Sequence, residues 1–285
     1  MLQTLVSGLL LGGLYALFAL GLSLMFGVMR LTNTAQGDFI VLGGFASIAA
    51  AAQFALHPTL AALVMLPLAF GAGYAIQRWV LNGTLGKDPL PSLVVTFGLA
   101  IVIQNALLEL FSADPRSLDS RGLNTASVDL GLLSVGALPL LIFAVALACT
   151  AALQALFTRT RLGRAFRAVS DDREIAELMG LKAGHVYALA TGIAFVLIAI
   201  AGALQAMRTT VSPSDGPLIL LFAFEAVIIG GMGSFWGTFV GAMLLGLTQQ
   251  IGFRIDPGWG LWAGHLMFLA LLVVRPQGLF PKTRG

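Results

Sequence analysis

Residues 5–28 read LVSGLLLGGLYALFALGLSLMFGV, and this stretch contains no charged side chain. A helix that crosses the hydrocarbon core of a bilayer, roughly 30 Å thick, needs about 20 mostly apolar residues. The stretch is therefore long enough to span a membrane. It is also longer than the apolar core of a signal peptide, and no basic residue precedes it. We therefore expect a retained span rather than a cleaved leader.

Eight more apolar runs follow along the chain. They cover Phe39–Leu56, Leu60–Val80, Ser92–Phe111, Leu132–Phe157, Val186–Met207, Leu218–Met232, Gly237–Phe253 and Gly260–Val274. Only 10% of the 285 residues are charged, whereas a soluble domain carries about 25%. We therefore predict an all-α fold, a polytopic transmembrane bundle of about eight or nine spans that forms a single domain over residues 1–285. The seventh and eighth runs are short and adjacent, so one of them could be a partial or broken span.

The distribution of basic residues predicts the orientation. If the spans alternate, most of the 16 Lys and Arg residues fall on one side of the membrane. This larger set is Arg30, Arg78, Lys87, Arg159, Arg161, Arg164, Arg167, Arg173, Lys182, Arg275, Lys282 and Arg284. The smaller set is Arg116, Arg121, Arg208 and Arg254. Because cytoplasmic loops accumulate Lys and Arg, we expect the larger set, and with it the C-terminus, to be cytoplasmic. The same rule explains the net charge of +3, and we expect no nucleic-acid partner.

Residues 158–187, TRTRLGRAFRAVSDDREIAELMGLKAGHVY, contain the long charged connection on the basic side. Asp171 and Glu174 have the spacing of a helix-capping box, and Gly180 is a natural helix stop. We expect a helix from Asp172 to Met179 whose apolar face is formed by Ile175, Leu178 and Met179. A two-turn helix is unstable alone in water. Its apolar face therefore needs a partner, either a cytoplasmic protein or the lipid headgroups.

Two polar features interrupt the apolar runs. The segment Asn33–Asp38 contains Gln36 and Gly37. It is either an ordinary short loop or a break that dips into the membrane and lines a substrate pathway. Glu225 lies midway along an apolar run, where a carboxylate cannot face lipid without a large penalty. It could serve a gate, pair with a base such as Arg208 or with another subunit, or be a buried acid satisfied by its neighbours.

Several glycines have the spacing of helix-packing motifs. Gly8 and Gly12 form one small-xxx-small pair and Gly260 and Gly264 another, and a longer row follows the seventh run, namely Gly233, Gly237 and Gly241. Small residues at this spacing let helix backbones approach each other closely within lipid. We expect these residues to pack helices, with a flexible hinge as the alternative.

Motifs for catalysis are absent from the sequence. It has no G-x-x-x-x-G-K-[ST] phosphate-binding loop, no G-x-S-x-G elbow and no H-E-x-x-H helix. His57, His185 and His265 lack a second ligand at metal spacing, so we interpret them as interfacial residues. We therefore expect that the chain is not an enzyme and binds no cofactor.

Several blocks in the chain carry a family resemblance. They are Gly12–Leu17 (GGLYAL), Asn33–Asp38 (NTAQGD), Gly163–Val169 (GRAFRAV), Asp171–Asp172 with Leu178–Gly180, Ile228–Ser234 (IIGGMGS) and Val274–Phe280 (VRPQGLF). In this order they resemble the LivH-type permease subunits of branched-chain amino-acid ABC importers. Three positions depart from the pattern. Thr34 and Gln36 stand where the family has an aromatic residue and a histidine, and Glu225 is reminiscent of the sister subunit, LivM.

The resemblance implies how the chain works and what it binds. Loop 158–185 would dock on a cytoplasmic ATPase through a coupling helix, using Gly163, Arg164, Arg167, Asp171, Asp172, Ile175, Leu178, Met179 and Gly180. The implied partners are a LivM-like sister permease, two ATPase subunits, a periplasmic substrate-binding protein and the lipid of a bacterial inner membrane. The implied cargo is branched-chain amino acids. One alternative is that the same machinery carries urea or short amides. Another is a secondary transporter or channel, but ion coupling would require several charges within the membrane, and this chain offers essentially Glu225.

The outer connection 112–131 is mixed in charge. Its charged residues are Asp114, Arg116, Asp119, Arg121 and Asp129. Together with Arg208, Asp215 and the pair Arg254 and Asp256, they could form a rim that receives the binding protein. The alternative is a solvated loop.

Overall fold

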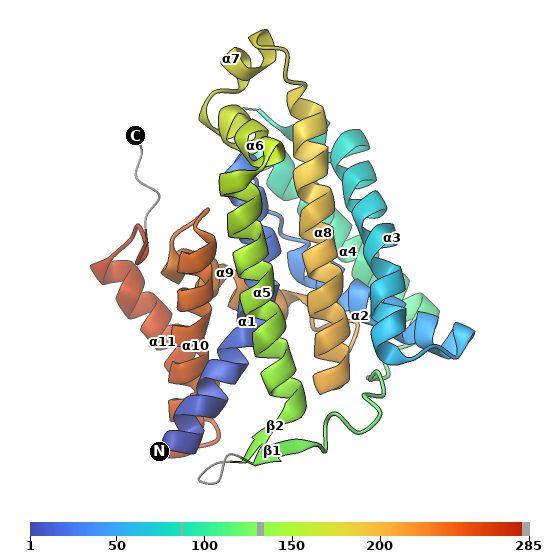
Figure 1. The fold of residues 1–285 in the computed structure, drawn as a ribbon, viewed down its shortest axis with the longest axis vertical. Coiled ribbons are helices and arrows are strands. Elements are labelled where there is room, and N and C mark those ends of the chain that lie inside the picture. The colour runs from blue at the N-terminus through green and yellow to red at the C-terminus, as the bar shows by residue number, and fades with distance from the viewer. Residues whose placement is uncertain (87, 130–133, 281–285) are drawn as a thin grey trace.

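The computed structural model describes residues 1–86, 88–129 and 134–280, and almost all of its regular structure is helical (Figure 1). The helices are α1 (Leu2–Met29), α2 (Gln36–Phe54), α3 (Pro58–Trp79), η1 (Leu81–Thr84), α4 (Leu90–Phe111), α5 (Ala137–Arg159), α6 (Arg161–Asp171), α7 (Arg173–Leu178), α8 (Ala183–Arg208), α9 (Gly216–Gly230), α10 (Phe235–Ile255) and α11 (Trp259–Val274). Strands β1 (Ser127–Asp129) and β2 (Ser134–Gly136) form a small antiparallel pair that the sequence did not predict. The start of the fifth apolar run, Leu132, lies outside the described residues, as do Lys87, Lys282 and Arg284.

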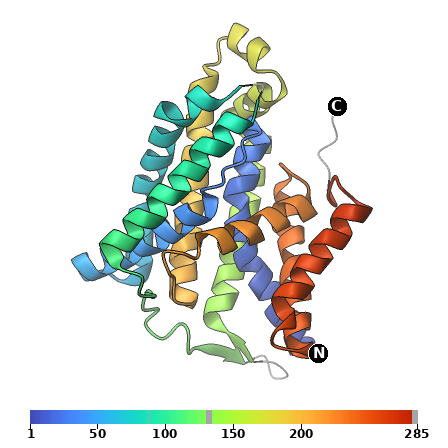
Figure 2. The same ribbon diagram turned by 180° about the vertical axis from the view of Figure 1, so that it is seen from behind.

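Helix α1 lies at the centre of the bundle and packs against α5, α8, α9 and α10 (Figures 1 and 2). Glycines make its crossing with α10 close. A Cβ added at Gly246 would lie 2.4 Å from the carbonyl oxygen of Gly8 and 2.5 Å from the amide nitrogen of Gly12. The predicted packing role of Gly8 and Gly12 is therefore confirmed. Backbones this close gain dispersion contacts that lipid chains cannot replace.

The bundle has two distinct ends. At one end lie α6 and α7, of which α7 projects beyond the other helices, and we call residues 160–182 the arm (Figure 1). The opposite end carries the N-terminus and the β1–β2 pair. Hydrogen bonds join the segments at this hairpin end, where the Leu118 amide donates to the Ala206 carbonyl at 2.8 Å and Arg254 donates to Thr4 at 3.0 Å. Most of the larger basic set lies on segments at the arm end.

The nine apolar runs do not all become complete spans. Six helices, α1 to α5 and α8, have the length and composition to cross a membrane. Helices α9 and α10 meet at a bend of 118°, which is the geometry of a broken span or re-entrant loop. The partial span expected among the seventh and eighth runs is therefore confirmed. Helix α11 has 16 residues and is apolar but shorter. The predicted number of eight or nine spans is therefore approximate.

Helices α3, α4 and α11 form the outer faces of the bundle. Their exposed side chains are mostly large and apolar, for example Leu63, Val94 and Phe97. Such a surface is unfavourable in water and matches a lipid environment or a second membrane subunit. The chain is therefore a multi-pass membrane protein.

Candidate coupling arm and membrane-buried polar sites

The arm begins at a tight elbow between α5 and α6. Thr160 caps α6, because its hydroxyl accepts a hydrogen bond from the Gly163 amide at 3.0 Å. At Gly163 an added Cβ would lie 2.2 Å from the Leu156 carbonyl oxygen, so only glycine fits. Arg167 closes the elbow by donating to the Phe157 carbonyl. Two predicted coupling residues, Gly163 and Arg167, therefore shape the arm, and Gly163 is buried.

Helix α6 fixes the arm to the membrane helices. Phe166 is fully buried and packs on the ring of Phe157 in α5. Ser170 donates a hydrogen bond to the Gly27 carbonyl of α1 at 2.9 Å. This helix was not predicted from the sequence, which indicated only one short helix in the loop. Helix α6 therefore contacts both α5 and the central helix α1.

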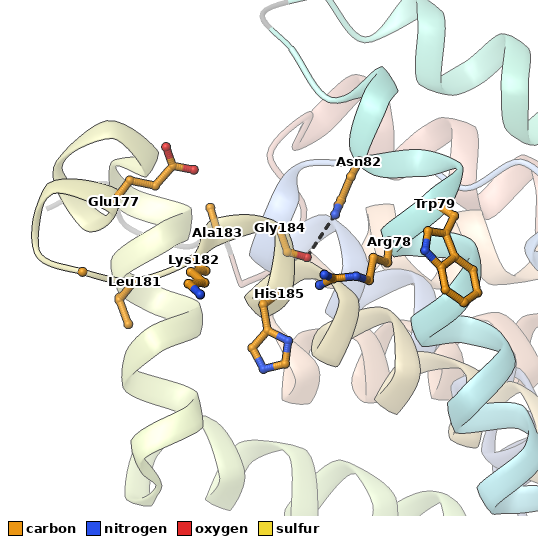
Figure 3. A pocket seen from close by; sticks show the side chains of 10 residues that line it. Arg78, Trp79, Asn82, Glu177, Leu181, Lys182, Ala183, Gly184 and His185 are labelled. Atoms are coloured by element: carbon orange, nitrogen blue, oxygen red, sulfur yellow. Dashed lines mark hydrogen bonds between the residues drawn. The ribbon is translucent and has the colours of Figure 1, made fainter.

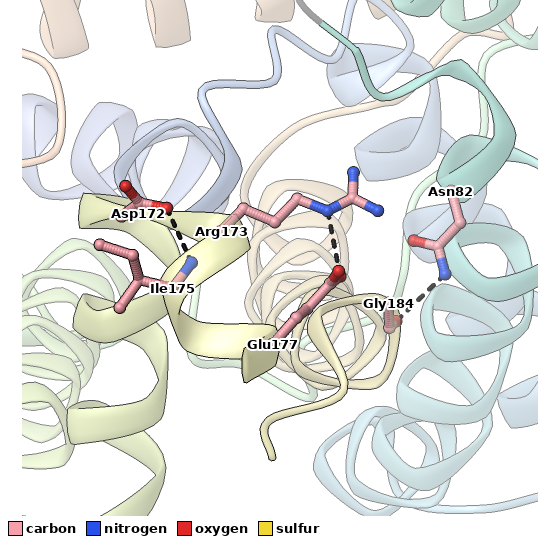
Figure 4. Close-up of polar contacts among 6 residues, drawn as sticks. All are labelled: Asn82, Asp172, Arg173, Ile175, Glu177 and Gly184. Atoms are coloured by element: carbon pink, nitrogen blue, oxygen red, sulfur yellow. Dashed lines mark hydrogen bonds and ion pairs between the residues drawn. The ribbon is translucent and has the colours of Figure 1, made fainter. Parts of the chain in front are cut away.

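Helix α7 forms the tip of the arm (Figure 4). Its cap is Asp172, whose carboxylate accepts from the Ile175 amide at 3.0 Å. The prediction that Asp171 is the cap is therefore wrong, because α6 extends through Asp171 and α7 starts one residue later. Arg173 and Glu177 form an exposed ion pair at 3.1 Å. Gly180 has φ +89°, which confirms it as the left-handed helix stop.

The apolar face of α7 has no cover. Leu178 is 86% exposed, Met179 81% and Ile175 59%. Ala176 is the buried residue of the helix and faces the rest of the arm. Exposed large apolar side chains on a projecting two-turn helix are typical of an interaction site. Asp171, Asp172 and Arg164 are also exposed around this tip.

The connection from α7 to α8 borders an open cavity of about 820 Å³ (Figure 3). Its lining includes the basic side chains of Arg78, Lys182 and His185 and the exposed ring of Trp79. Asn82 donates to the Gly184 carbonyl at 3.1 Å and so holds the start of α8 against η1. Basic residues beside an exposed tryptophan are typical of a membrane interface.

The break between α1 and α2 dips into the bundle. The Gln36 amide donates to the carbonyl of Phe18, near the middle of α1, at 3.2 Å, and Gln36 is fully buried. Asn33 is also buried, and its side chain accepts from the Ala35 amide at 3.0 Å. The segment is therefore not an ordinary surface loop, and α2 starts at mid-bundle depth.

Helices α2 and α9 meet at this depth through two glycines. A Cβ added at Gly37 would lie 1.9 Å from the Gly216 carbonyl oxygen. Asp38 lies in the first turn of α2, as predicted, and accepts a hydrogen bond from Gln104 of α4 at 2.8 Å. The start of α9 packs directly on its carboxylate. The N-terminal ends of α2 and α9 thus meet at one buried acid.

Glu225 lies in α9 but outside this cluster. It follows Gly216 by nine residues, which at about 100° per residue places it on the opposite face of the helix. Its carboxylate is 2.5 Å from Nδ1 of His265 in α11, and its second oxygen has no hydrogen bond within the described residues. The candidate partner Arg208 makes no such contact. The interpretation of His265 as an ordinary interfacial residue is wrong.

A ring stack lies beside this pair. Tyr15 of α1 stacks on Phe222 with centroids 4.7 Å apart, and Phe222 stacks on His265 at 6.2 Å. The Tyr15 hydroxyl donates to Gln249 of α10 at 2.6 Å. The sequence analysis missed Tyr15, Gln249 and Gln104 as buried polar partners. Their polar character at mid-span was the available signal.

The glycine row after α9 has two roles. Gly237 and Gly241 pack against α9, since a Cβ at either position would lie within 2.5 Å of the Gly230 or Ala226 carbonyl oxygen. Gly233 is different. It lies in the turn between α9 and α10 with φ +82°, and its backbone approaches α1, where a Cβ added at Gly27 would lie 3.2 Å from the Gly233 Cα atom. Gly260 and Gly264 pack α11 against Phe253 and Gln249 of α10.

The outer connection lies across the end of α8 rather than extending freely. Arg116 and Val211 exchange backbone hydrogen bonds of 3.0 and 2.7 Å. Asn124 donates to the Met207 carbonyl at 2.7 Å. Arg116, one of the mixed charges predicted as a rim, is therefore fixed at the hairpin end by its backbone.

Comparison with known proteins identifies the family. The profile of the family described as "Branched-chain amino acid transport system / permease component" matches residues 4–275. The chain is 30% identical to the branched-chain amino acid permease protein BraD of Pseudomonas aeruginosa, covering 99% of this chain and 96% of BraD. It is 25% identical to LivH of Escherichia coli with the same coverage. A further match, to LivM of Escherichia coli, is 33% identical and covers 44% of this chain and 30% of LivM.

Among solved structures, a chain of PsaBC from Streptococcus pneumoniae in complex with Fab has a similar fold. The TM-score is 0.50 with 13% identity, covering 95% of this chain and 90% of that chain. This similarity concerns the fold alone. The sequence matches extend over nearly the full length, including both the arm and the bent pair of α9 and α10. The chain therefore belongs to the family of permease components of branched-chain amino acid transport systems.

Proposed function

We propose that this chain is one membrane subunit of an ATP-driven importer for branched-chain amino acids in a bacterial inner membrane. The observation that carries the proposal is the uncovered apolar tip of the arm, Ile175, Leu178 and Met179, on an elbow bound to α1 and α5. In this proposal a cytoplasmic ATPase covers the tip. ATP and Mg²⁺ bind to partner subunits, and two ATPase copies or paralogues serve the pair of permeases.

The orientation in this proposal follows the charges. Most basic residues of the described chain lie at the arm end, and Lys and Arg accumulate in cytoplasmic segments. The arm and the C-terminus would then be cytoplasmic, and the hairpin end would face a periplasmic binding protein. The partial similarity to LivM supports a LivM-like sister permease as the second membrane subunit.

In this proposal the buried polar groups serve the substrate pathway. Asn33, Gln36, Gly37 and Asp38 form one group where α2 meets α9, and Glu225 with His265 forms another beside α11. Both groups involve α9, which the 118° bend separates from α10. Movement of α9 relative to α1 would change both groups together.

The test is reconstitution of the complex. The full-length chain is co-expressed with its sister permease and ATPase subunits, purified and placed in liposomes with the cognate binding protein. We expect leucine, isoleucine or valine to stimulate ATP hydrolysis, and urea or acetamide to leave it unchanged. Stimulation by urea or acetamide alone would assign the other cargo class, and failure of any ATPase subunit to co-purify would contradict the proposal.

A further inference from the structure

A cavity of about 260 Å³ opens at the hairpin end between α1, α10 and the start of α5. It is separate from the polar groups described above. Its walls are Gln3, Val6, Ser7, Leu10 and Leu11 of α1, residues 134–136 and Pro139, and Arg208 and Gln250. Pockets for drug-sized ligands measure roughly 300–1,000 Å³. This cavity therefore suits a smaller molecule.

Arg208 is the charged residue of this wall. It is half-buried at the end of α8, and within the described residues it has neither a hydrogen bond nor an ion pair. A cation at the end of a helix complements the helix dipole. The dipole does not explain why the side chain lines a polar cavity, where a partly desolvated charge without a partner is unfavourable.

The remaining wall residues fit a small zwitterion. A guanidinium group binds a carboxylate through two parallel hydrogen bonds. The amides of Gln3 and Gln250 and the hydroxyl of Ser7 offer acceptors for an ammonium group. Val6, Leu10 and Leu11 form the apolar part of the wall, against which an aliphatic side chain can pack. Carboxylate, ammonium and aliphatic side chain are the three parts of a neutral amino acid.

We infer that this cavity is a binding subsite for a free neutral aliphatic amino acid, with Arg208 holding its α-carboxylate. The inference rests on the proposed function in taking amino acids as the cargo. Tyr15 lies next along the way into the bundle, since the wall residue Leu11 precedes it by one helical turn. The Tyr15 hydroxyl donates to Gln249, so the subsite lies one helical turn from a buried polar contact of the bundle.

The test measures binding without transport. The purified full-length chain in phosphatidylcholine nanodiscs is titrated with L-leucine, L-leucinamide or acetate, and apparent affinity is obtained from the rise of Tm. We expect leucine to stabilise the wild type and leucinamide, which lacks the carboxylate, to have little effect. Because hydrogen bonds to a charged group are strong, Arg208→Gln should weaken leucine binding about tenfold to a hundredfold. Arg208→Lys, which keeps the charge but not the paired donors, should lose less.

Arg254→Gln is the matched control, because Arg254 lies at the same end and donates to Thr4 outside the cavity. It should bind leucine as the wild type does. Absence of leucine stabilisation in the wild type, or equal affinity in Arg208→Gln, would overturn the inference. If phosphatidylglycerol stabilises the protein through Arg208 and leucine does not, the cavity binds a lipid phosphate and the inference is overturned. Since no ATPase is present, this failure is distinct from failure of the complex to assemble.

Discussion

Leu178→Asp is expected to weaken ATPase binding, so that ATP hydrolysis no longer drives uptake, while the permease stays folded. Leu178 is 86% exposed, so the change removes no internal packing. Docking would instead bury a carboxylate at the centre of the apolar tip. Loss of a central interface residue costs about 2 kcal/mol or more, which is roughly a 30-fold loss of affinity. Co-purification of the ATPase and amino-acid uptake should both fall by at least that factor.

Leu90→Asp is the control for this prediction. Leu90 is 61% exposed, begins α4 at the arm end and does not belong to the apolar tip of the arm. An acid in the first turn of a helix is favourable, so this variant should retain ATPase binding and uptake. Normal coupling in Leu178→Asp at unchanged protein level would remove the tip of the arm from the mechanism.

Gly37→Ala is expected to have the largest effect on stability. The new Cβ would lie 1.9 Å from the Gly216 carbonyl oxygen and 2.8 Å from the Leu220 amide nitrogen. The clash is with backbone, so no rotamer change relieves it. Overpacking typically costs 1–3 kcal/mol, and here we expect roughly 3 kcal/mol or more. The variant should give little monodisperse protein on size-exclusion chromatography and a markedly lower Tm.

Gly98→Ala makes the same change where there is space. Gly98 lies within α4, and nothing lies within 4 Å of its added Cβ. Alanine is the better helix former by about 1 kcal/mol, so this variant should be as stable as the wild type or more so. Equal Tm values for the two variants would mean that α2 and α9 do not meet at these glycines.

The apolar runs made most of the helices predictable from sequence. The length and apolar composition of a segment largely determine whether it can cross the bilayer as a helix, and both can be read from that segment alone. The predicted helix boundaries were less accurate than the predicted helices themselves, since α5 starts at Ala137 rather than near Leu132. The adjacent acids Asp171 and Asp172 are both good caps, and the choice between them depends on where α6 ends.

The missed features depend on contacts distant in sequence. Helix α6 is short and polar overall. Its two buried residues, Phe166 and Val169, are covered by contacts with α5 and α1, which the local sequence does not reveal. The Glu225–His265 contact joins positions 40 residues apart. Gly233 and Gly237 have the same packing-motif spacing in sequence, but Gly233 lies in a turn, whereas Gly237 lies within α10 where that helix packs against α9. Tertiary packing makes these distinctions.

The central claim is that the tip of α7 lies in the cytosol against another protein. Its most direct test uses Leu178→Cys in a Cys149→Ala background, which removes the other cysteine of the chain. A membrane-impermeant maleimide is applied to intact spheroplasts and to inverted vesicles, with and without bound ATPase. We predict labelling only in inverted vesicles, and protection when the ATPase is bound. Labelling of the Leu178→Cys variant from outside intact spheroplasts would contradict the account.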